Sequence, residues 1–194
     1  MPDKDYSIIQ RILAGEKKAY AELVDKHKDR AMTLAMRMLK NHQDAEEALQ
    51  DAFIRAFHAL PKFERKSSFS TWFYRIVYNV CATALSRREQ SIHVSIEQQN
   101  EDERFIELPS EDAQPDAEYE SREFEEILYE EIEKLPAHYS SLFTLFIVQN
   151  MSYEQIVEVT GLPLGTVKAR LFRARMMLKE AIVERLGSIS HVFG

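Results

Sequence analysis

The sequence predicts an all-α protein of two small helical domains joined by a flexible acidic linker. Three observations lead to this fold class. Five glycines and six prolines among 194 residues are fewer than sheet-rich chains need for their turns. Apolar residues recur at intervals of three and four along two blocks, as on one face of a helix. Between the blocks lies a stretch rich in Glu, Gln, Asn, Ser and Asp, which cannot form a packed core. The expected parts are a first domain at 1–90, a linker at 91–118, a second domain at 119–187 and a tail at 188–194.

Charge follows the same division. Residues 1–94 carry a net charge of +4, residues 95–133 carry −14 and residues 134–194 carry +3, within a total of −7. Because charge acts over about 10 Å at 0.1 M salt, the two basic blocks can bind a polyanion despite the negative total. A solvated acidic linker between two ordinary domains explains the charges equally well.

Apolar spacing predicts four helices in the first domain. Gly15 ends the first helix, Asn41 can cap the third, and Pro61 stops that third helix. Ser67 or Ser68 can cap the fourth. The approximate ranges are 8–13, 20–38, 45–57 and 69–88.

The second domain contains a motif with clear start and stop signals. Ser152 and Gln155 form a capping-box pattern before a short helix, and Gly161 allows the left-handed turn that ends it. A further helix then begins at Gly165 or Thr166. A short helix, a glycine-containing turn and a second helix are the layout of a helix-turn-helix. Two helices precede this motif, at about 119–135 and 136–147.

The second helix of this motif has the pattern of a recognition helix. From Leu162 to Lys179 the chain has five basic residues and no acidic one, which suits the major groove of DNA. Phe172 is expected to point outward, where it can contact a thymine methyl group or a sugar. An ordinary solvated basic helix, with Phe172 packed against a neighbour, is the alternative. The expected buried stripe is Val167, Leu171, Ala174 and Leu178.

Aromatic and basic side chains alternate between Lys62 and Arg88. Aromatic rings beside cations can hold unstacked single-stranded bases, at about 1–3 kcal/mol per base. Trp72, Phe73 and Ile76 share one helical face, however, and are expected in the core. On the residues alone, a packed helix with a basic rim remains the favoured interpretation.

Several function classes are disfavoured by what the chain lacks. A single cysteine, Cys81, excludes an internal disulfide, and the scattered histidines give no metal-binding pair. No nucleophile–base pair or glycine-rich phosphate loop is present, so we expect no catalytic residue, no metal, no cofactor and no enzymatic activity. The chain starts without the apolar core of a signal peptide, and no apolar run approaches about 18 residues. We therefore expect a cytoplasmic protein with no membrane insertion of its own.

Three segments together resemble a bacterial RNA polymerase sigma factor of the sigma-70 family. They are Gln50–Phe57 (QDAFIRAF), Phe69–Ile76 (FSTWFYRI) and the helix-turn-helix from Ser152 (SYEQI) through Gly165–Arg175 (GTVKARLFRAR). Their order and spacing match the small extracytoplasmic-function type (group 4), which keeps only the second and fourth sigma domains. The resemblance implies a promoter-specificity subunit that binds core RNA polymerase, recognises the −35 and −10 promoter elements and helps melt DNA for a stress or envelope-response regulon. An anti-sigma factor is an expected further partner.

The resemblance also implies a role for individual residues. The linker would thread the polymerase channel towards its active site. Core polymerase would contact Glu47, Gln50, Asp51 and Arg55. The −10 element would be bound by Phe63, Lys66, Ser67, Ser68, Trp72, Arg75, Asn79 and Thr83. The −35 element would be bound by Ser152, Tyr153, Thr166, Lys168, Ala169, Arg170, Phe172, Arg173 and Arg175.

Two other functions compete with this interpretation. A helix-turn-helix repressor would bind an operator without polymerase, usually as a dimer on two half-sites, and no dimer-forming segment is evident. A helical interaction protein with no DNA role would leave the acid-free recognition helix unexplained. Co-elution with core polymerase, followed by initiation at a defined promoter, separates the three.

Overall fold

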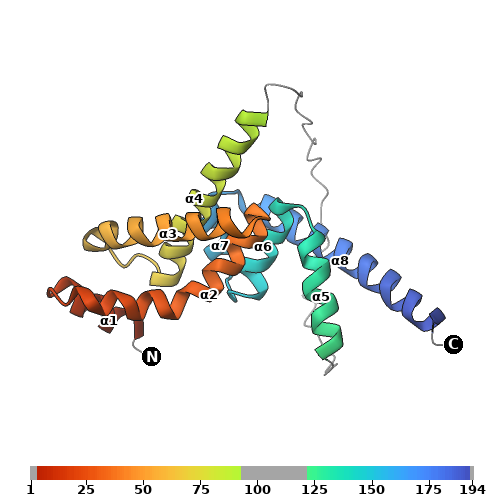
Figure 1. Cartoon of the computed structure of the whole chain (residues 1–194), viewed down its shortest axis with the longest axis horizontal. Coiled ribbons are helices and arrows are strands. Elements are labelled where there is room, and N and C mark those ends of the chain that lie inside the picture. Colours follow the sequence, from red (N-terminus) through yellow and green to blue (C-terminus); the bar gives the residue numbers. More distant parts are fainter. Residues whose placement is uncertain (1–3, 93–121, 193–194) are drawn as a thin grey trace.

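The structure, a computed structural model, describes residues 4–92 and 122–192. Every regular element within these residues is a helix, in agreement with the predicted fold class (Figure 1). Most of the predicted linker lies outside the described residues. The α-helices are α1 (Lys4–Leu13), α2 (Tyr20–Leu39), α3 (His42–Ala59), α4 (Phe69–Ile92), α5 (Arg122–Lys134), α6 (Ala137–Ile147), α7 (Tyr153–Thr160) and α8 (Leu164–Val192), with short 3₁₀ turns at Lys17–Ala19 and Leu60–Lys62.

The predicted helix boundaries of the first domain rest on side-chain caps. The Asn41 side chain accepts a hydrogen bond from the Asp44 amide at 2.9 Å, which caps α3. Of the two serines proposed to cap α4, Ser68 does so, because its Oγ accepts the Thr71 amide at 3.1 Å. Gly15 follows α1 with φ of +106°, a conformation that glycine adopts without strain.

The last helix is longer than the sequence predicted. α8 continues to Val192, through residues that we expected to form a tail. No proline interrupts this stretch, and the single Gly187 costs a helix only about 1 kcal/mol relative to alanine. Arg185 also holds α8 to α5 through ion pairs with Glu130 at 2.5 Å and Glu131 at 3.0 Å.

The two domains pack directly on one another. α2 contacts α6 and α4 contacts α7. Hydrogen bonds cross this boundary from Ser140 Oγ to the Arg37 carbonyl at 3.2 Å and from Gln155 Nε2 to Thr71 Oγ1 at 3.4 Å. Sequence periodicity identified the helices but did not place them against each other, so this boundary is new information from the structure.

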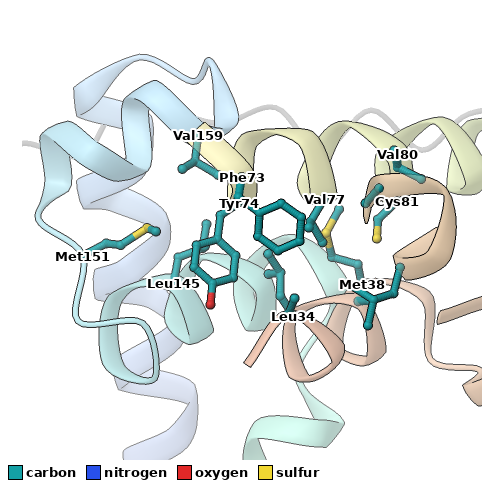
Figure 2. Packing of buried hydrophobic residues seen from close by; sticks show 14 of the residues in the cluster. Leu34, Met38, Phe73, Tyr74, Val77, Val80, Cys81, Leu145, Met151 and Val159 are labelled. Atoms are coloured by element: carbon teal, nitrogen blue, oxygen red, sulfur yellow. The ribbon is translucent and has the colours of Figure 1, made fainter. Parts of the chain in front are cut away.

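A single buried apolar cluster runs through both domains. Figure 2 shows it from close by: Leu34 and Phe73 from the first domain lie in the same cluster as Leu145 and Val159 from the second. All four side chains are essentially inaccessible to solvent. Their burial stabilises the packed arrangement, since it removes apolar surface of both domains from water.

Candidate nucleic-acid interface

The first helix of the helix-turn-helix is capped at both ends. Gln155 donates its amide to Ser152 Oγ at 3.3 Å, and the Gln155 side chain accepts the Ser152 amide at 2.9 Å. The predicted capping box is therefore confirmed. Gly161 ends α7 with φ of +73°, as predicted, and three residues later α8 begins. These local signals set the angle at which α8 leaves the motif.

One face of α8 is buried and the other is open. The predicted stripe of Val167, Leu171, Ala174 and Leu178 is confirmed, with none of the four more than 4% exposed. Phe172 points away from this stripe and is 42% exposed. Lys168 and Arg175 are exposed on the same outward side, and Ala169, Arg170 and Arg173 are half-buried at its margins. The outward face thus combines positive charge with one exposed aromatic ring.

A row of rings and cations holds this face to α6 and α7. The Tyr153 and Phe146 rings stack with centroids 5.4 Å apart. Lys168 Nζ lies 6.0 Å from the Tyr153 centroid, and Arg175 Cζ lies 5.1 Å from the Phe146 centroid. Cations over ring faces are attracted by the ring quadrupole. Two basic side chains of α8 are therefore positioned before any ligand arrives.

One acidic group lies near the start of this face. Hydrogen bonds from Ser152 and from the backbone, with a smaller contribution from the charge of Lys168, lower the pKa of Glu154. Glu154 is therefore ionised at neutral pH and offsets part of the Lys168 charge. Ser152 and Thr166 flank this point, exposed and half-buried respectively.

A second polar stripe runs along α4. Arg75, Asn79 and Thr83 are exposed and follow one another at intervals of four, so they line one side of the helix. Thr83 Oγ1 donates to the backbone carbonyl of Asn79 at 2.8 Å, so this hydrogen bond does not use the Asn79 side chain. Phe73 and Val77, on the other side, are fully buried and anchor the stripe.

Two aromatic rings meet where the preceding loop joins α4. The Phe63 and Trp72 ring centroids lie 5.0 Å apart, and both residues are half-buried. The expectation that Trp72 and Ile76 are core residues like Phe73 holds only in part, because both are half-buried. Successive helical residues lie 100° apart, so these two fall at the edge of an arc centred on Phe73.

The loop itself has features that the sequence did not reveal. Arg65 adopts a left-handed φ of +59°, and its guanidinium carbon lies 3.6 Å above the Tyr6 ring of α1. Lys66 is exposed and pairs with Glu64. Ser67 is half-buried and precedes the capping residue Ser68. The contact with Tyr6 holds the loop to α1. No signal in the sequence indicates that Arg65 and Tyr6 lie close together, so only the structure identifies this contact.

The residues assigned to polymerase contact lie on α3 beside a groove. Three of them, Glu47, Asp51 and Arg55, line a cavity of about 650 Å³ between α3 and α4, while Gln50 is exposed on the same helix but outside that lining. Arg55 Nε donates to Asp51 Oδ1 at 2.9 Å. Thr83, assigned to the −10 element, lines the same groove from α4. The structure thus brings residues of two predicted contact sets to one surface.

An exposed apolar side chain of α3 was missed by the sequence analysis. Ile54 lies between Asp51 and Arg55 in the sequence and is 58% exposed. It lines a second, largely apolar groove with Phe53 and Phe57 rather than the groove between α3 and α4. An isoleucine among charged residues on the outward face of a helix was the available signal.

Other kinds of site were sought in the same part of the chain. Residues 4–92 and 122–192 contain no group of three His, Cys, Asp or Glu side chains that could hold a metal ion. No helix in these ranges combines the length and apolar character needed to cross a membrane.

Family models match both domains. Sigma-70 region 2 matches residues 23–91 and Sigma-70 region 4 matches residues 125–178. The first range contains α3, the loop and most of α4, and the second contains the helix-turn-helix. Each set of predicted site residues therefore falls inside a family domain.

Similar proteins cover nearly the whole chain. An extracytoplasmic-function (ECF) RNA polymerase sigma-E factor of Haemophilus influenzae is 32% identical over 92% of this chain and 95% of its own. The ECF sigma factor SigW of Bacillus subtilis is 30% identical over 90% and 94%, respectively.

Solved structures show the same fold. The sigma factor RpoE in complex with the anti-sigma factor NepR, from Bartonella quintana, superposes with a TM-score of 0.63 at 24% identity, covering 85% of this chain and 97% of that one. CnrH in complex with the cytosolic domain of CnrY superposes with a TM-score of 0.59 at 20% identity, covering 91% and 96%. Family domains, relatives and fold agree: this chain belongs to the extracytoplasmic-function group of sigma-70 family RNA polymerase sigma factors, which are promoter-specificity subunits in transcription initiation and not enzymes.

Proposed function

We propose that this sigma factor divides promoter recognition between its two open helix faces. The outward face of α8 reads the −35 element, and the stripe of Arg75, Asn79 and Thr83 on α4 reads the −10 element. The α3 surface around Asp51 and Arg55 binds core RNA polymerase. The protein acts in the cytoplasm, where bacterial polymerase and chromosomal DNA are found.

The observation that carries this proposal is the construction of α8. Its buried stripe fixes the helix in the second domain, so the outward face with Phe172 and Arg173 is presented in one orientation. Some basic side chains of such a helix contact phosphates and fix its register on the duplex, while residues nearer its N-terminal end reach base edges. The first half of α8 is the part that enters the major groove in a helix-turn-helix.

DNA melting is proposed for the loop before α4. The half-buried rings of Phe63 and Trp72 form an aromatic surface beside exposed Lys66. A base that leaves the duplex can stack on such a surface at a gain of about 1–3 kcal/mol. That gain offsets part of the cost of unpairing, so the open promoter is favoured on this protein.

An anti-sigma factor is proposed as the regulatory partner. RpoE and CnrH, two structurally similar proteins, were solved in complex with another protein, and the partner of RpoE, NepR, is named as an anti-sigma factor. The α3 surface, with exposed Ile54 beside Asp51 and Arg55, offers apolar and charged groups that an inhibitor would share with polymerase. We further propose that the genes controlled belong to a stress or envelope response.

Reconstituted transcription tests the central proposal. Purified core polymerase is mixed with the chain, and start sites are mapped on genomic DNA to reveal the shared upstream elements. We expect defined starts with common −35 and −10 sequences, and permanganate-reactive thymines near the start. Trp72→Ala should reduce this reactivity more than it reduces binding to double-stranded promoter DNA. Failure to co-elute with core polymerase, or starts without shared elements, would contradict the proposal.

A further inference from the structure

A small pocket lies at the boundary between the two domains. Its volume is about 320 Å³. α2 contributes Lys26, His27 and Arg30, α4 contributes Ser70 and Tyr74, and Gln149 comes from the turn after α6. None of these residues belongs to the proposed polymerase or promoter contacts, so the pocket has no assigned role.

Two polar atoms of this pocket are buried without a partner. Within the described part of the chain, neither Tyr74 Oη nor Gln149 Oε1 makes a hydrogen bond. Tyr74 is only 2% exposed, and in Figure 2 its hydroxyl lies at the end of the ring that points away from α4. A buried polar group left unpaired is costly, so a molecule that pairs with both atoms would be favoured in this pocket.

The charge of the pocket is positive. Asp5 engages Lys26 at 2.6 Å and His27 at 3.1 Å, which offsets the charge of Lys26. No ion pair joins the Arg30 guanidinium within residues 4–92 and 122–192. Burial raises the pKa of Tyr74, the positive charge of Arg30 partly opposes that rise, and the negative charge of Asp5 adds to it. The uncompensated charge is therefore that of Arg30.

The orientation of Gln149 decides which anion fits. Its Nε2 donates to the Arg30 carbonyl at 3.0 Å, so Oε1 is the atom left as an acceptor. Arg30, Tyr74 and Ser70 can each donate a hydrogen bond, while Gln149 Oε1 requires a donor. Hydrogen phosphate supplies both kinds of group, because it keeps one P–OH at neutral pH beside its acceptor oxygens. Sulfate is fully deprotonated and has no proton to give.

We propose that this interdomain pocket binds inorganic hydrogen phosphate. Phosphate oxygens accept from Arg30, Tyr74 and Ser70, and the P–OH donates to Gln149 Oε1. Because α2 and α4 belong to one domain and Gln149 to the other, the site exists only when the domains are packed. Bound phosphate consequently stabilises the packed arrangement by mass action.

Phosphorus NMR and thermal unfolding of the full-length chain test the proposal. We expect saturable broadening of the inorganic phosphate signal, and a melting temperature that rises with phosphate more than with sulfate at equal ionic strength. Parallel titration with adenosine monophosphate tests the P–OH donor, because a phosphate monoester has a second pKa of about 6 and is mostly without a P–OH at neutral pH. It should bind more weakly than inorganic phosphate, and equal or tighter binding of the ester would contradict the P–OH contact with Gln149. Equal responses to phosphate and sulfate would overturn the proposed selectivity and with it the site.

Three variants locate the site. Arg30→Gln should weaken phosphate binding by roughly tenfold or more, since it removes a charge-assisted hydrogen bond. Lys28→Gln is the matched control, because it removes the same charge from an exposed position of α2 and should leave binding unchanged. Tyr74→Phe should leave the melting temperature in chloride unchanged or higher, because it deletes an unpaired buried hydroxyl, while phosphate no longer raises it as far. Equal losses in Arg30→Gln and Lys28→Gln, or full phosphate stabilisation of Tyr74→Phe, would show that phosphate binds elsewhere.

Discussion

The two long helices α4 and α8 differ in how much of their surface is buried. Each presents polar residues to a proposed DNA ligand and buries the opposite side. On α8 the buried residues between Leu164 and Arg185 form one narrow stripe that includes Val167 and Leu171. On α4 the buried arc is wide, from Phe69 and Phe73 to Thr71 and Tyr74, because helices of both domains pack against it.

This difference shows that helices of both domains pack against α4, whereas α8 packs against helices of the second domain. The polar stripe of α4 is supported from behind by the first domain and from the side by α7. α8 rests on α5, α6 and α7 of the second domain. Separation of the domains would therefore expose one flank of α4 but leave the packing of α8 intact.

The largest expected effect comes from truncating Phe73, at the centre of the buried side of α4. Phe73 stacks on Phe53 at 4.6 Å and on Phe69 at 5.8 Å, so Phe73→Ala should lower the free energy of unfolding by about 3–5 kcal/mol. Leu171→Ala, the corresponding change on α8, should cost about 2–4 kcal/mol. Urea unfolding followed by circular dichroism measures both.

The exposed Phe172 provides the control for these two variants. Phe172→Ala should change the free energy of unfolding by about 0.5 kcal/mol or less, because the side chain is 42% exposed. A larger loss for Leu171→Ala than for Phe73→Ala would break the comparison, since α8 would then be the more strongly held helix.

The next effect concerns DNA reading by α8. Arg173→Ala should weaken binding to a −35 duplex by about 1–3 kcal/mol if the guanidinium meets a base edge. Arg175→Ala should weaken specific and random duplexes alike and reduce the salt dependence by roughly one phosphate contact. Fluorescence anisotropy at several salt concentrations measures both. Equal losses of the two variants on specific and random DNA would remove Arg173 from base recognition.

Sequence reasoning located the local features of both helices but not their surroundings. The cap at Asn41, the capping box of Ser152 and Gln155, and the turn at Gly161 are encoded within a few residues, so they could be predicted. The half-burial of Trp72 and the contact between Arg65 and Tyr6 depend on which helices pack together. Periodicity reports that a face is buried, not what covers it.

The same limit applies to the boundary between the domains. Thr71 and Tyr74 gave no sign that they face α7 or a pocket, because both lie within one apolar-rich helix. Ile54 was readable as an outward apolar residue only in part, since Asp51 and Arg55 are charged but Phe53 and Phe57 are also its neighbours on α3. The assignment of individual residues to promoter or polymerase came from the family motifs, and it stays a prediction.

A smaller effect tests the contacts through which Asp5 holds α1 to α2. Asp5 is 2% exposed and pairs with His27, whose ring lies 5.2 Å from that of Phe69. Burial alone would raise the pKa of Asp5, but hydrogen bonds and charges from His27 and Lys26 outweigh it, so the pKa is lowered. Asp5→Asn should therefore cost about 1–2 kcal/mol at pH 7.

The pH dependence of that cost has a definite sign. A carboxyl with a lowered pKa contributes stability above its unfolded pKa, about 3.9, and loses it as the pH falls through the lower folded value. The difference in the free energy of unfolding between wild type and Asp5→Asn should thus be present above about pH 4 and shrink below it. Urea unfolding at each pH measures it, and a difference that persists at pH 3 would show that the Asp5 contacts do not depend on its charge.

The smallest expected effect on folding belongs to the exposed ion pair on α3. Arg55 and Asp51 form an exposed pair at i and i+4, with Nη2 and Oδ2 2.8 Å apart, and such pairs contribute only about 0.3–0.5 kcal/mol. Arg55→Gln should therefore leave the melting temperature nearly unchanged. If core polymerase uses this surface, its affinity should nevertheless fall several-fold, because a charged contact at the interface is lost while the fold is kept. Lys28→Gln, which removes a charge from an exposed position of α2 outside the predicted set and outside both α3 grooves, is the control. Equal polymerase binding by Arg55→Gln, Lys28→Gln and the wild type would show that Arg55 is not part of the contact surface.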